Sequence, residues 1–289
     1  MRAVAEVLIE PIVTVYTPES PLRHPLQLFR AMWRDLLASR ELAWCLMVQD
    51  ISAQYRQSAF GILWALIPPV ATAVVFIILN REGAIRIEST TVPYPAFVMF
   101  GTVLWQLFID SVYAPLKAMQ TGKSLITKVH FPREAIILSG IGQTLFYCGI
   151  RTLILVAVFI IYQVPVGWGL VMSLCLMLML MLLGIAVGLL LLPVGMLYTD
   201  VMAALGTVTS LWFFVTPVVY PPPDRWPYSL LVTLNPVTPL LVGVRDLALR
   251  GELTNGLSVA IVSGLTLVAL VFMWILLRIS LPIWTERSG

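Results

Sequence analysis

The stretch LVMSLCLMLMLMLLGIAVGLLLLP, residues 170–193, contains no charged side chain in 24 positions. A helix of about 20 predominantly apolar residues is long enough to cross the hydrocarbon core of a bilayer. Residues 170–193 therefore predict a transmembrane helix. The whole chain agrees with this assignment, because 59% of its 289 residues are hydrophobic and only 11% are charged, whereas soluble domains carry roughly 25% charged residues.

Five further segments on either side of this helix have the length and composition of transmembrane helices. They are residues 60–80, 95–114, 135–162, 202–220 and 257–278. The sequence thus predicts an all-α integral membrane protein with six transmembrane helices. Its expected parts are an N-terminal cytoplasmic or interfacial segment (1–58), a six-helix transmembrane domain (59–280) and a cytoplasmic tail (281–289).

Lysine and arginine are distributed unequally between the two sides of the predicted helices. Twelve lie on the side that holds both termini and residues 115–134, and five lie on the opposite side. Cytoplasmic loops carry the excess of Lys and Arg in membrane proteins, so both termini are expected in the cytoplasm. The acidic residues Glu6 and Glu10 break the apolar core that a signal peptide would need. Insertion is therefore expected to use the internal spans.

The segment before the first span contains an amphipathic pattern. Apolar residues recur at helical spacing from Leu26 to Leu37, while Arg30 and Arg34 occupy the other face. This pattern predicts a helix that lies flat at the membrane surface with Trp33 at the depth of the lipid headgroups. The alternative is a helix that packs against the bundle. A second, more polar short helix is expected from Arg40 to Gln57.

Between the fifth and sixth predicted spans, seven prolines interrupt the apolar stretch 210–249. No piece after the first proline is long enough to cross a bilayer. Residues 226–234 and 237–250 are long enough for short helices, and Asn235 with Pro236 suits a turn or cap between them. We expect these helices to be re-entrant, dipping into the outer leaflet and returning. The alternative is a pair of surface loops over the bundle.

Two ionisable side chains fall inside the predicted spans, which is the default place to look for function in a membrane protein. Asp110 is expected toward the cytoplasmic end of the second span and Arg151 near the middle of the third. At these different depths a direct pair is left open. Arg151 either faces a hydrated pathway and contacts an anionic substrate, or bonds to helix carbonyls or to an acid of an outer loop.

Other motifs give no enzymatic or metal chemistry. The tetrapeptide TGKS (121–124) resembles the end of a phosphate-binding loop, but Lys117 stands where the first glycine belongs and no strand precedes it. A short helix with a turn at Gly122 is the better interpretation. The three cysteines and two histidines have no metal-ligand spacing. No intramembrane relay of Asp, Glu or His exists for proton-coupled transport.

Five segments in order resemble one family, the type-2 ABC transporter permeases that export polysaccharides such as O-antigen, capsule and teichoic acid. They are YRQSAFGILWALIPP (55–69), LITKVHFPRE (125–134), YTDV (198–201), LWFFVTPVVYP (211–221) and LNPVTPLLVGVRDLAL (234–249). The resemblance covers nearly the whole chain from about Leu26. The chain departs from the family in having no acidic residue near Tyr147, in carrying Arg151, and in its first 21 residues.

The resemblance implies a half-transporter in the cytoplasmic membrane of a bacterium. Two copies of the chain would form a homodimer in contact with membrane lipids, and two soluble ABC ATPase subunits would dock from the cytoplasm. The expected cargo is a lipid-linked polysaccharide, and no nucleic acid is expected as a partner. The chain itself is expected to hold no cofactor, because ATP and Mg would bind to the partner subunit, and it is expected not to be an enzyme.

The resemblance also suggests roles for individual residues. The candidates for the substrate pathway are Arg151 and the aromatic residues Trp64, Phe76, Trp212, Phe213 and Tyr220, whose rings offer flat surfaces for the apolar faces of sugars. The alternative for each ring is contact with lipid or a place in an interfacial aromatic belt. The candidates for coupling to the ATPase are Gln54, Tyr55, Arg56, Lys123, Lys128, His130 and Arg133, from the 40–57 helix and the basic loop 115–134. The candidates for an outer gate are Trp226, Asn235, Pro236 and Arg245.

Three other functions share some of these features. An ABC exporter of small molecules or drugs would have a similar topology. A membrane-embedded enzyme acting on lipids or glycans would need polar residues clustered at one membrane face, whereas Asp110, Asp200 and Asp224 are scattered along the sequence. A passive channel would not require an ATPase that purifies with it.

Overall fold

The computed structural model describes residues 25–56, 60–85, 90, 92–126, 134–163, 167–198, 200–223 and 226–288. The chain divides into two compact units, Met1–Ala38 and Ser39–Gly289. Every element within the described ranges is helical, so the expected all-α fold is confirmed for this part of the chain.

The helix α1 runs from Pro25 to Arg56 without a break. The prediction of two separate helices in this segment is therefore wrong. No glycine or proline lies between Leu26 and Gln57, so nothing in this stretch favours a chain reversal. Within the first unit, Trp33 and Leu37 are exposed. The interfacial position of this segment stays a prediction.

In the described part of the chain, four helices are long and apolar enough to cross a membrane. These are α3 (Tyr94–Ile126), α4 (Glu134–Ile161), α5 (Trp168–Leu197) and α9 (Gly256–Ser288). A bent pair, α7 (Tyr228–Leu234) and α8 (Val237–Arg250), would make a fifth span if both helices formed one crossing. The six spans expected from the sequence are therefore confirmed only for the second, third, fourth and sixth.

The first and fifth predicted spans are shorter helices than expected. The helix α2 (Ile67–Arg81) has 15 residues and follows a separate 3-10 helix, η2 (Gly61–Ala65), because Pro68 and Pro69 fix the start of α2 at its first turn. The helix α6 (Asp200–Val215) has 16 residues. It stops before Pro217, since the residue preceding a proline is disfavoured in the helical conformation.

The core of the second unit lies around α3 and α5, which pack against each other. Their close approach depends on small residues, as is typical of helices in membranes. A Cβ atom at Gly188 of α5 would lie 2.3 Å from the Val112 carbonyl oxygen of α3. The helices α2 and α4 pack against α3, and α8 and α9 pack against α5. The apolar segment of α9 is only 11% buried, so most of its surface remains available to lipid.

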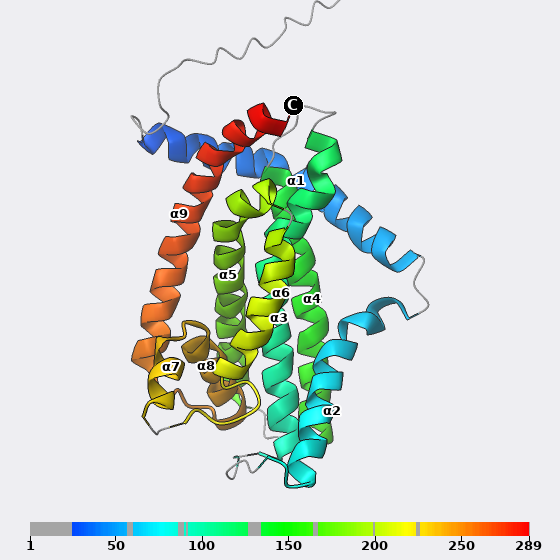
Figure 1. Ribbon diagram of the computed structural model, residues 1–289, viewed down its shortest axis with the longest axis vertical. Helices are drawn as coiled ribbons and strands as arrows, with labels where there is room; N and C mark the ends of the chain where they lie inside the picture. Colours follow the sequence, from blue (N-terminus) through cyan, green and yellow to red (C-terminus); the bar gives the residue numbers. More distant parts are fainter. Residues whose placement is uncertain are drawn as a thin grey trace, which may run out of the picture. The chain divides into compact units, whose positions relative to one another are not determined.

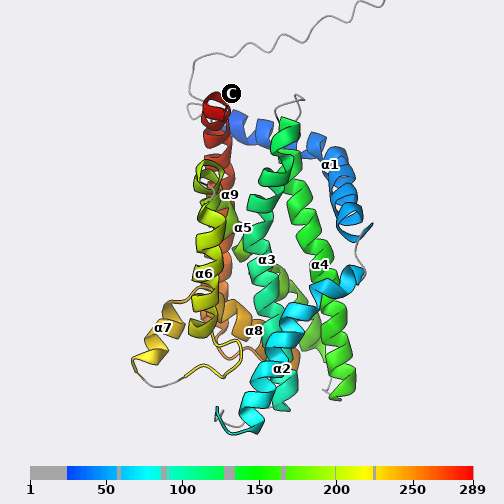
Figure 2. The same cartoon turned by 45° about the vertical axis from the view of Figure 1, so that its right-hand side comes forward.

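The two ends of the bundle of long helices differ in the segments that lie there. The short helices α7 and α8 gather at the end where α3 and α9 begin (Figures 1 and 2). At the opposite end, Arg278 of α9 lies 3.8 Å from Glu134 at the start of α4. The α7–α8 segment and the Glu134–Arg278 contact therefore lie at opposite ends of the long helices, as the predicted topology requires. Which side is cytoplasmic stays a prediction.

Candidate functional site

A polar cavity of about 560 Å³ opens among the apolar helices of the second unit. Its walls come from the end of α1, from η2 and the start of α2, and from the middle of α3 and α4. The residues that give it polar character are Asp50, Gln54 and Tyr55 of α1, Gln106, Asp110 and Lys117 of α3, and Gln143, Tyr147 and Arg151 of α4. Polar groups inside spans are costly and therefore point to function.

Two residues of the cavity lining, Arg151 and Asp110, form an ion pair. The Arg151 side chain is 2% exposed and that of Asp110 is 28% exposed. Gln106 donates a second hydrogen bond to Asp110, with Nε2 3.0 Å from Oδ1. Burying an unpaired guanidinium would be far more costly than burying a paired one, so Asp110 is what allows Arg151 to sit inside the bundle.

The structure corrects the expected depth of Asp110. The helix α3 continues to Ile126 and its apolar span runs from Tyr94 to Gly122. Asp110 therefore lies in the middle of the span, level with Arg151, and not near its cytoplasmic end. The sequence left open whether Arg151 pairs directly with Asp110. The structure shows this pair and also places Arg151 in the cavity lining.

A second network ties α1 to α4 at the edge of the same cavity. Gln143 Nε2 donates to Asp50 Oδ2 at 2.8 Å. Tyr147 donates its hydroxyl to Gln54 Oε1 at 2.6 Å and accepts the Tyr55 hydroxyl at 3.0 Å. Burial raises the pKa of Asp50, and the hydrogen bond from Gln143 acts in the opposite direction. The two networks together fix the polar wall of the cavity.

Two further side chains complete the lining. Trp64 is 55% exposed, borders the cavity and meets Phe60 edge to face at 6.0 Å between ring centroids. Lys117 lies with its Nζ 5.3 Å from the Tyr113 ring centre. The arrangement offers hydrogen-bond donors and acceptors and an aromatic face, so it can hold a polar ligand. Among the described residues, no cluster of three or more His, Cys, Asp or Glu can hold a metal.

The remaining predicted pathway aromatics lie together, but away from this cavity. Trp212 of α6 packs against Phe108 of α3, with ring centroids 5.3 Å apart, and Phe213 packs against Phe76 of α2 at 5.9 Å. Tyr220 donates its hydroxyl to the Phe214 carbonyl at 2.8 Å. These rings join α2, α3 and α6. Their contact with a substrate stays a prediction.

Asn235 and Pro236, two of the predicted gate residues, lie at the junction of the short helices α7 and α8. The helices α7 and α8 meet at 90°, and the buried Asn235 between them bonds to three partners. Its Oδ1 accepts from Trp212 Nε1 and from the Val237 amide, both at 3.1 Å, and its Nδ2 donates to Thr216 Oγ1 at 2.8 Å. Pro236 completes the turn. The junction of α7 and α8 is thereby tied to the end of α6.

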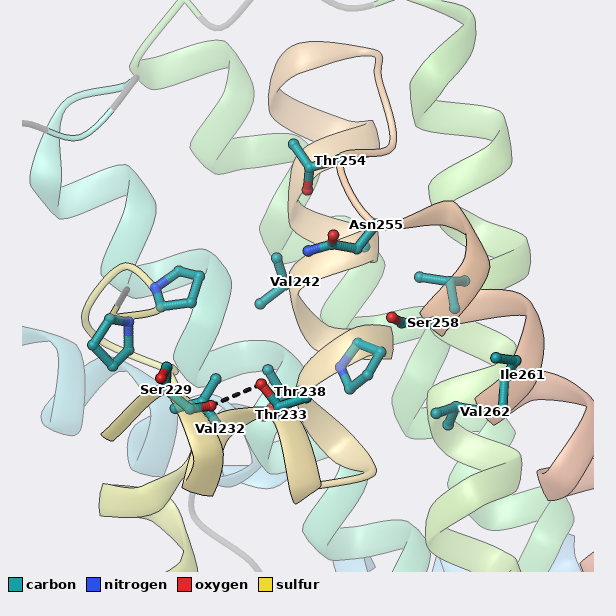
Figure 3. Close-up of a pocket in the computed structure, with 15 residues that line it drawn as sticks. Ser229, Val232, Thr233, Thr238, Val242, Thr254, Asn255, Ser258, Ile261 and Val262 are labelled. Carbon is teal, nitrogen blue, oxygen red and sulfur yellow. Dashed lines mark hydrogen bonds between the residues drawn. The ribbon is translucent and has the colours of Figure 1, made fainter. Parts of the chain in front are cut away.

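The other two gate candidates differ in their surroundings. Arg245 is buried, with its guanidinium carbon 4.0 Å from the Phe97 ring centre and Nη1 donating to the Pro217 carbonyl at 3.2 Å. Trp226 is 80% exposed. Beside them, a second cavity of about 490 Å³ lies between α7, α8 and the start of α9 (Figure 3). Its polar lining includes the hydroxyls of Ser229, Thr233 and Ser258.

The predicted coupling residues are only partly described. Gln54 and Tyr55 border the polar cavity, and Arg56 ends α1. Lys128, His130 and Arg133 lie outside the described residues, as does the side chain of Lys123.

The turn expected at Gly122 is wrong, because residues 115–126 belong to α3. A Cβ atom at Gly122 would lie 2.6 Å from the side chain of Ile136. The absence of a side chain at this position therefore allows α3 and α4 to pack closely.

Sequence reasoning missed several residues that the structure brings into the cavity. Gln106 and Gln143 are amides inside predicted spans, and a polar side chain in an apolar helix was a signal that pointed to them. Lys117 was noted only for the excess of positive charge and as the mismatch to a phosphate-binding loop. Asp50 had no comparable signal, because its helix was expected to lie apart from the spans. Its place in the cavity follows from the packing of α1 on α4 through the bond to Gln143.

Comparison with known proteins identifies similar chains along most of this length. The sequence pattern of ABC-2 type transporters matches residues 41–249. The O-antigen export system permease protein RfbA of Myxococcus xanthus is 24% identical over 244 residues, which is 83% of this chain and 92% of the relative. An RfbA permease of Klebsiella pneumoniae is 24% identical over 234 residues, 77% and 86% of the two chains. The polysialic acid transport protein KpsM of Escherichia coli is 21% identical over 240 residues, 78% and 88%.

Proposed function

The chain belongs to the ABC-2 type transporter family, and on that premise we propose that it is the permease subunit of an ATP-driven exporter of a lipid-linked polysaccharide. The observation that carries the proposal is the family match over residues 41–249, which includes both the polar cavity and the outer helices. The relatives are permeases named for the export of O-antigen and the transport of polysialic acid. Both of these cargoes are polysaccharides.

The polar cavity is the feature of the structure that fits transport of a hydrophilic cargo. Membrane-spanning helices tolerate the Arg151–Asp110 pair because protein groups partner it, and such pairs mark substrate or ion pathways. The cavity joins α1, which precedes the spans, to the middle of α3 and α4. In the proposed mechanism, a polar part of the cargo enters here while its lipid part stays in the bilayer.

The energy for export comes from a separate ATPase in this proposal. The motif TGKS lacks the first glycine and the preceding strand of a phosphate-binding loop. Two ATPase subunits, which bind ATP and Mg, dock on two copies of the chain in the cytoplasmic membrane. The end of α1 and the basic segment 115–134 provide the contacts. Because Gln54 and Tyr55 also border the cavity, a movement of α1 at the ATPase changes the cavity wall directly.

The outer helices α7 and α8 form the exit side in the proposed arrangement. Their bent shape and the bonds of Asn235 to α6 connect this exit to the aromatic cluster around Trp212. A re-entrant pair in this place closes the exit when no cargo is present. Displacement of α6 would release it.

The first experiment purifies the tagged chain from its source membranes in a mild detergent and identifies what comes with it. We expect a stoichiometric soluble ATPase and ATP hydrolysis in the eluate. Replacing Lys123, Lys128 and Arg133 together should release the ATPase, whereas replacing Arg81, on the expected outer side, should not. If no ATPase is present in either detergent or intact membranes, the permease proposal fails, and a channel or a membrane-embedded enzyme becomes the better explanation.

A further inference from the structure

Arg151 has hydrogen-bonding capacity that the described part of the chain leaves unused. A guanidinium carries five N–H groups. The Nη2 atom bonds to Asp110, while Nε and Nη1 are buried without a hydrogen-bond partner among the described residues. An unpaired buried donor costs about 1–3 kcal/mol, and more when it is charged. Since Arg151 lines the cavity, a ligand that brings acceptor oxygens would satisfy these groups.

The charges around the cavity balance. Two carboxylates, Asp50 and Asp110, and two cations, Lys117 and Arg151, line it, so the formal charge of the lining is zero. An anionic ligand would gain from the two cations and be repelled by the two carboxylates at short range. Asp110 already compensates the charge of Arg151. The site is therefore better suited to an uncharged ligand than to a phosphate or a carboxylate.

The other polar groups of the cavity suit hydroxyl groups. Gln54, Gln106 and Gln143 each carry both a donor and an acceptor on a planar amide. A hydroxyl group donates one hydrogen bond and accepts others, so it can bond to an amide, to a carboxylate and to Arg151 alike. A ligand with several hydroxyls can use the donors and acceptors of these groups that their bonds within the chain leave free, whereas an apolar molecule cannot.

Trp64 supplies an apolar face beside these polar groups. Its indole is 55% exposed and borders the cavity, and the edge contact with Phe60 supports the ring. Rigid aromatic rings provide a large contact area at a small loss of conformational entropy. A sugar has a C–H face that can lie on such a ring and hydroxyls around its edge. The cavity volume of about 560 Å³ lies within the roughly 300–1,000 Å³ of small-molecule sites.

We propose that this cavity binds an uncharged sugar unit. Arg151 and the glutamine amides bond to its hydroxyls, Trp64 stacks on its C–H face, and Asp110 is a positioning residue that orients the guanidinium. The proposal rests on the proposed function for its biological meaning, because the sugar unit would belong to the exported polymer. The cavity thereby selects for a neutral over an acidic sugar at the point where the cargo enters the bundle.

The test measures sugar binding without any ATPase. The full chain is placed in phospholipid nanodiscs free of glycoside detergent. Saturation-transfer NMR then follows the methyl glycosides of glucose, galactose, mannose and N-acetylglucosamine. We expect transfer to the ring C–H protons of at least one glycoside. N-acetylneuraminic acid and inorganic phosphate, added as competitors, should not reduce that signal.

Matched variants locate the binding. The double variant Asp110→Asn with Arg151→Gln removes both charges together and leaves no isolated buried charge. It should weaken binding about tenfold or more, since a loss of about 1.4 kcal/mol is a factor of ten. Trp64→Ala should weaken binding, and Trp64→Phe should restore most of it. Trp168→Ala serves as the control, because this tryptophan is 88% exposed and does not line the cavity.

Four results would overturn the inference. They are no transfer from any of the glycosides to a folded protein, equal transfer in the double variant, an equal effect of the Trp64 and Trp168 substitutions, and displacement by phosphate or by the acidic sugar. The outcome is separate from that of the proposed function. A chain that binds glycoside but purifies without an ATPase keeps the sugar site and loses the exporter. A chain that purifies with the ATPase but does not bind glycosides keeps the exporter and loses the sugar site.

Discussion

Loss of Asp110 and loss of Arg151 should have unequal effects on the stability of the protein. Arg151 is almost fully buried, whereas Asp110 keeps 28% of its side chain exposed and has a second partner in Gln106. The cost of breaking a buried ion pair depends on which charge is left behind without compensation. The environment of each residue therefore decides which substitution the protein tolerates.

At this scale, Asp110→Leu should destabilise the protein more than Arg151→Leu. The first change strands the Arg151 guanidinium in the bundle, at a cost of about 3–5 kcal/mol. The second leaves a carboxylate that still accepts from Gln106 and contacts water. Thermal unfolding of the purified variants in the same detergent measures the difference. Equal midpoints, or a lower midpoint for Arg151→Leu, would contradict this order.

Asp50 should give the protein a pH-dependent weakness. Burial raises its pKa from the ordinary value of 3.8, so its ionised form is less favourable in the folded than in the unfolded state. The resulting penalty is absent below the unfolded pKa, grows as the pH rises through the folded pKa, and is complete above it.

Asp50→Asn removes this penalty and can still accept the hydrogen bond from Gln143. We expect it to raise the unfolding midpoint at pH 7. The gain in the free energy of unfolding should be less than about 1 kcal/mol, because a partly exposed group is screened by water. The gain should shrink toward about pH 4, near the unfolded value. Asp50→Ala, which loses the hydrogen bond, is the control. A gain that is the same at both pH values would show that the charge is not its cause.

Among the helices, Asn235 connects the start of α8 to the end of α6. Its amide side chain accepts a hydrogen bond from the Val237 amide at the start of α8 and bonds to Trp212 and Thr216 at the end of α6. Asn235→Ala should cost about 2–3 kcal/mol, since three hydrogen bonds at about 1 kcal/mol each are lost. Asn235→Asp keeps the acceptor oxygen and should cost less. Unfolding midpoints test the order, and an aspartate variant weaker than the alanine variant would reverse it.

The helices α7 and α8 offer a direct test of the re-entrant arrangement. With Cys45, Cys148 and Cys175 replaced by alanine, single cysteines are placed at Tyr228, Leu230 and Leu234, which are exposed on α7. In the re-entrant arrangement lipid would cover them, so they should resist a membrane-impermeant maleimide. A cysteine at the exposed Glu252, beyond α8, should react. Uniform reaction at all four positions would favour surface loops.

Helix existence was easier to predict than helix length. The apolar runs that became α4, α5 and α9 were identified because composition alone decides whether a segment suits lipid. The ends of α2 and α6 were misplaced, since Pro68, Pro69 and Pro217 limit them through local backbone sterics. The continuation of α3 past Lys117 was missed because its polar last turns look like a loop, and their helical state is supported by packing against α4.

The candidate site was less predictable for a physical reason. Arg151 and Trp64 were identified as polar or aromatic exceptions within apolar sequence. Asp50 and Gln143, which are hydrogen-bonded to each other at the edge of the same cavity, are 93 positions apart in the chain. Tyr55 and Tyr147 are 92 positions apart. Such pairs arise only when α1 packs on α4, and no periodicity in the sequence encodes that contact. The aromatic cluster around Trp212 likewise depends on α2, α3 and α6 coming together.

For the whole molecule, the proposal requires an assembly that a single 32.1 kDa chain does not provide. In that proposal the chain supplies the membrane path and a separate subunit hydrolyses ATP. A two-fold pair is the simplest closed assembly that presents one identical docking surface to each of two ATPase subunits. Native mass spectrometry of the complex should therefore give a mass that corresponds to two permease chains and two ATPase chains.

Raising the salt concentration should strip the ATPase before the permease pair separates. Contacts through exposed basic side chains are screened by ions, whereas helices paired in lipid are held by close packing. The species that remains should therefore contain two permease chains and no ATPase. A surviving complex of one permease with one ATPase would reverse the assumed order of contact strengths. It would also mean that each chain is a complete pathway, in which case the cavity within one chain, and not an interface between two, would have to carry the cargo.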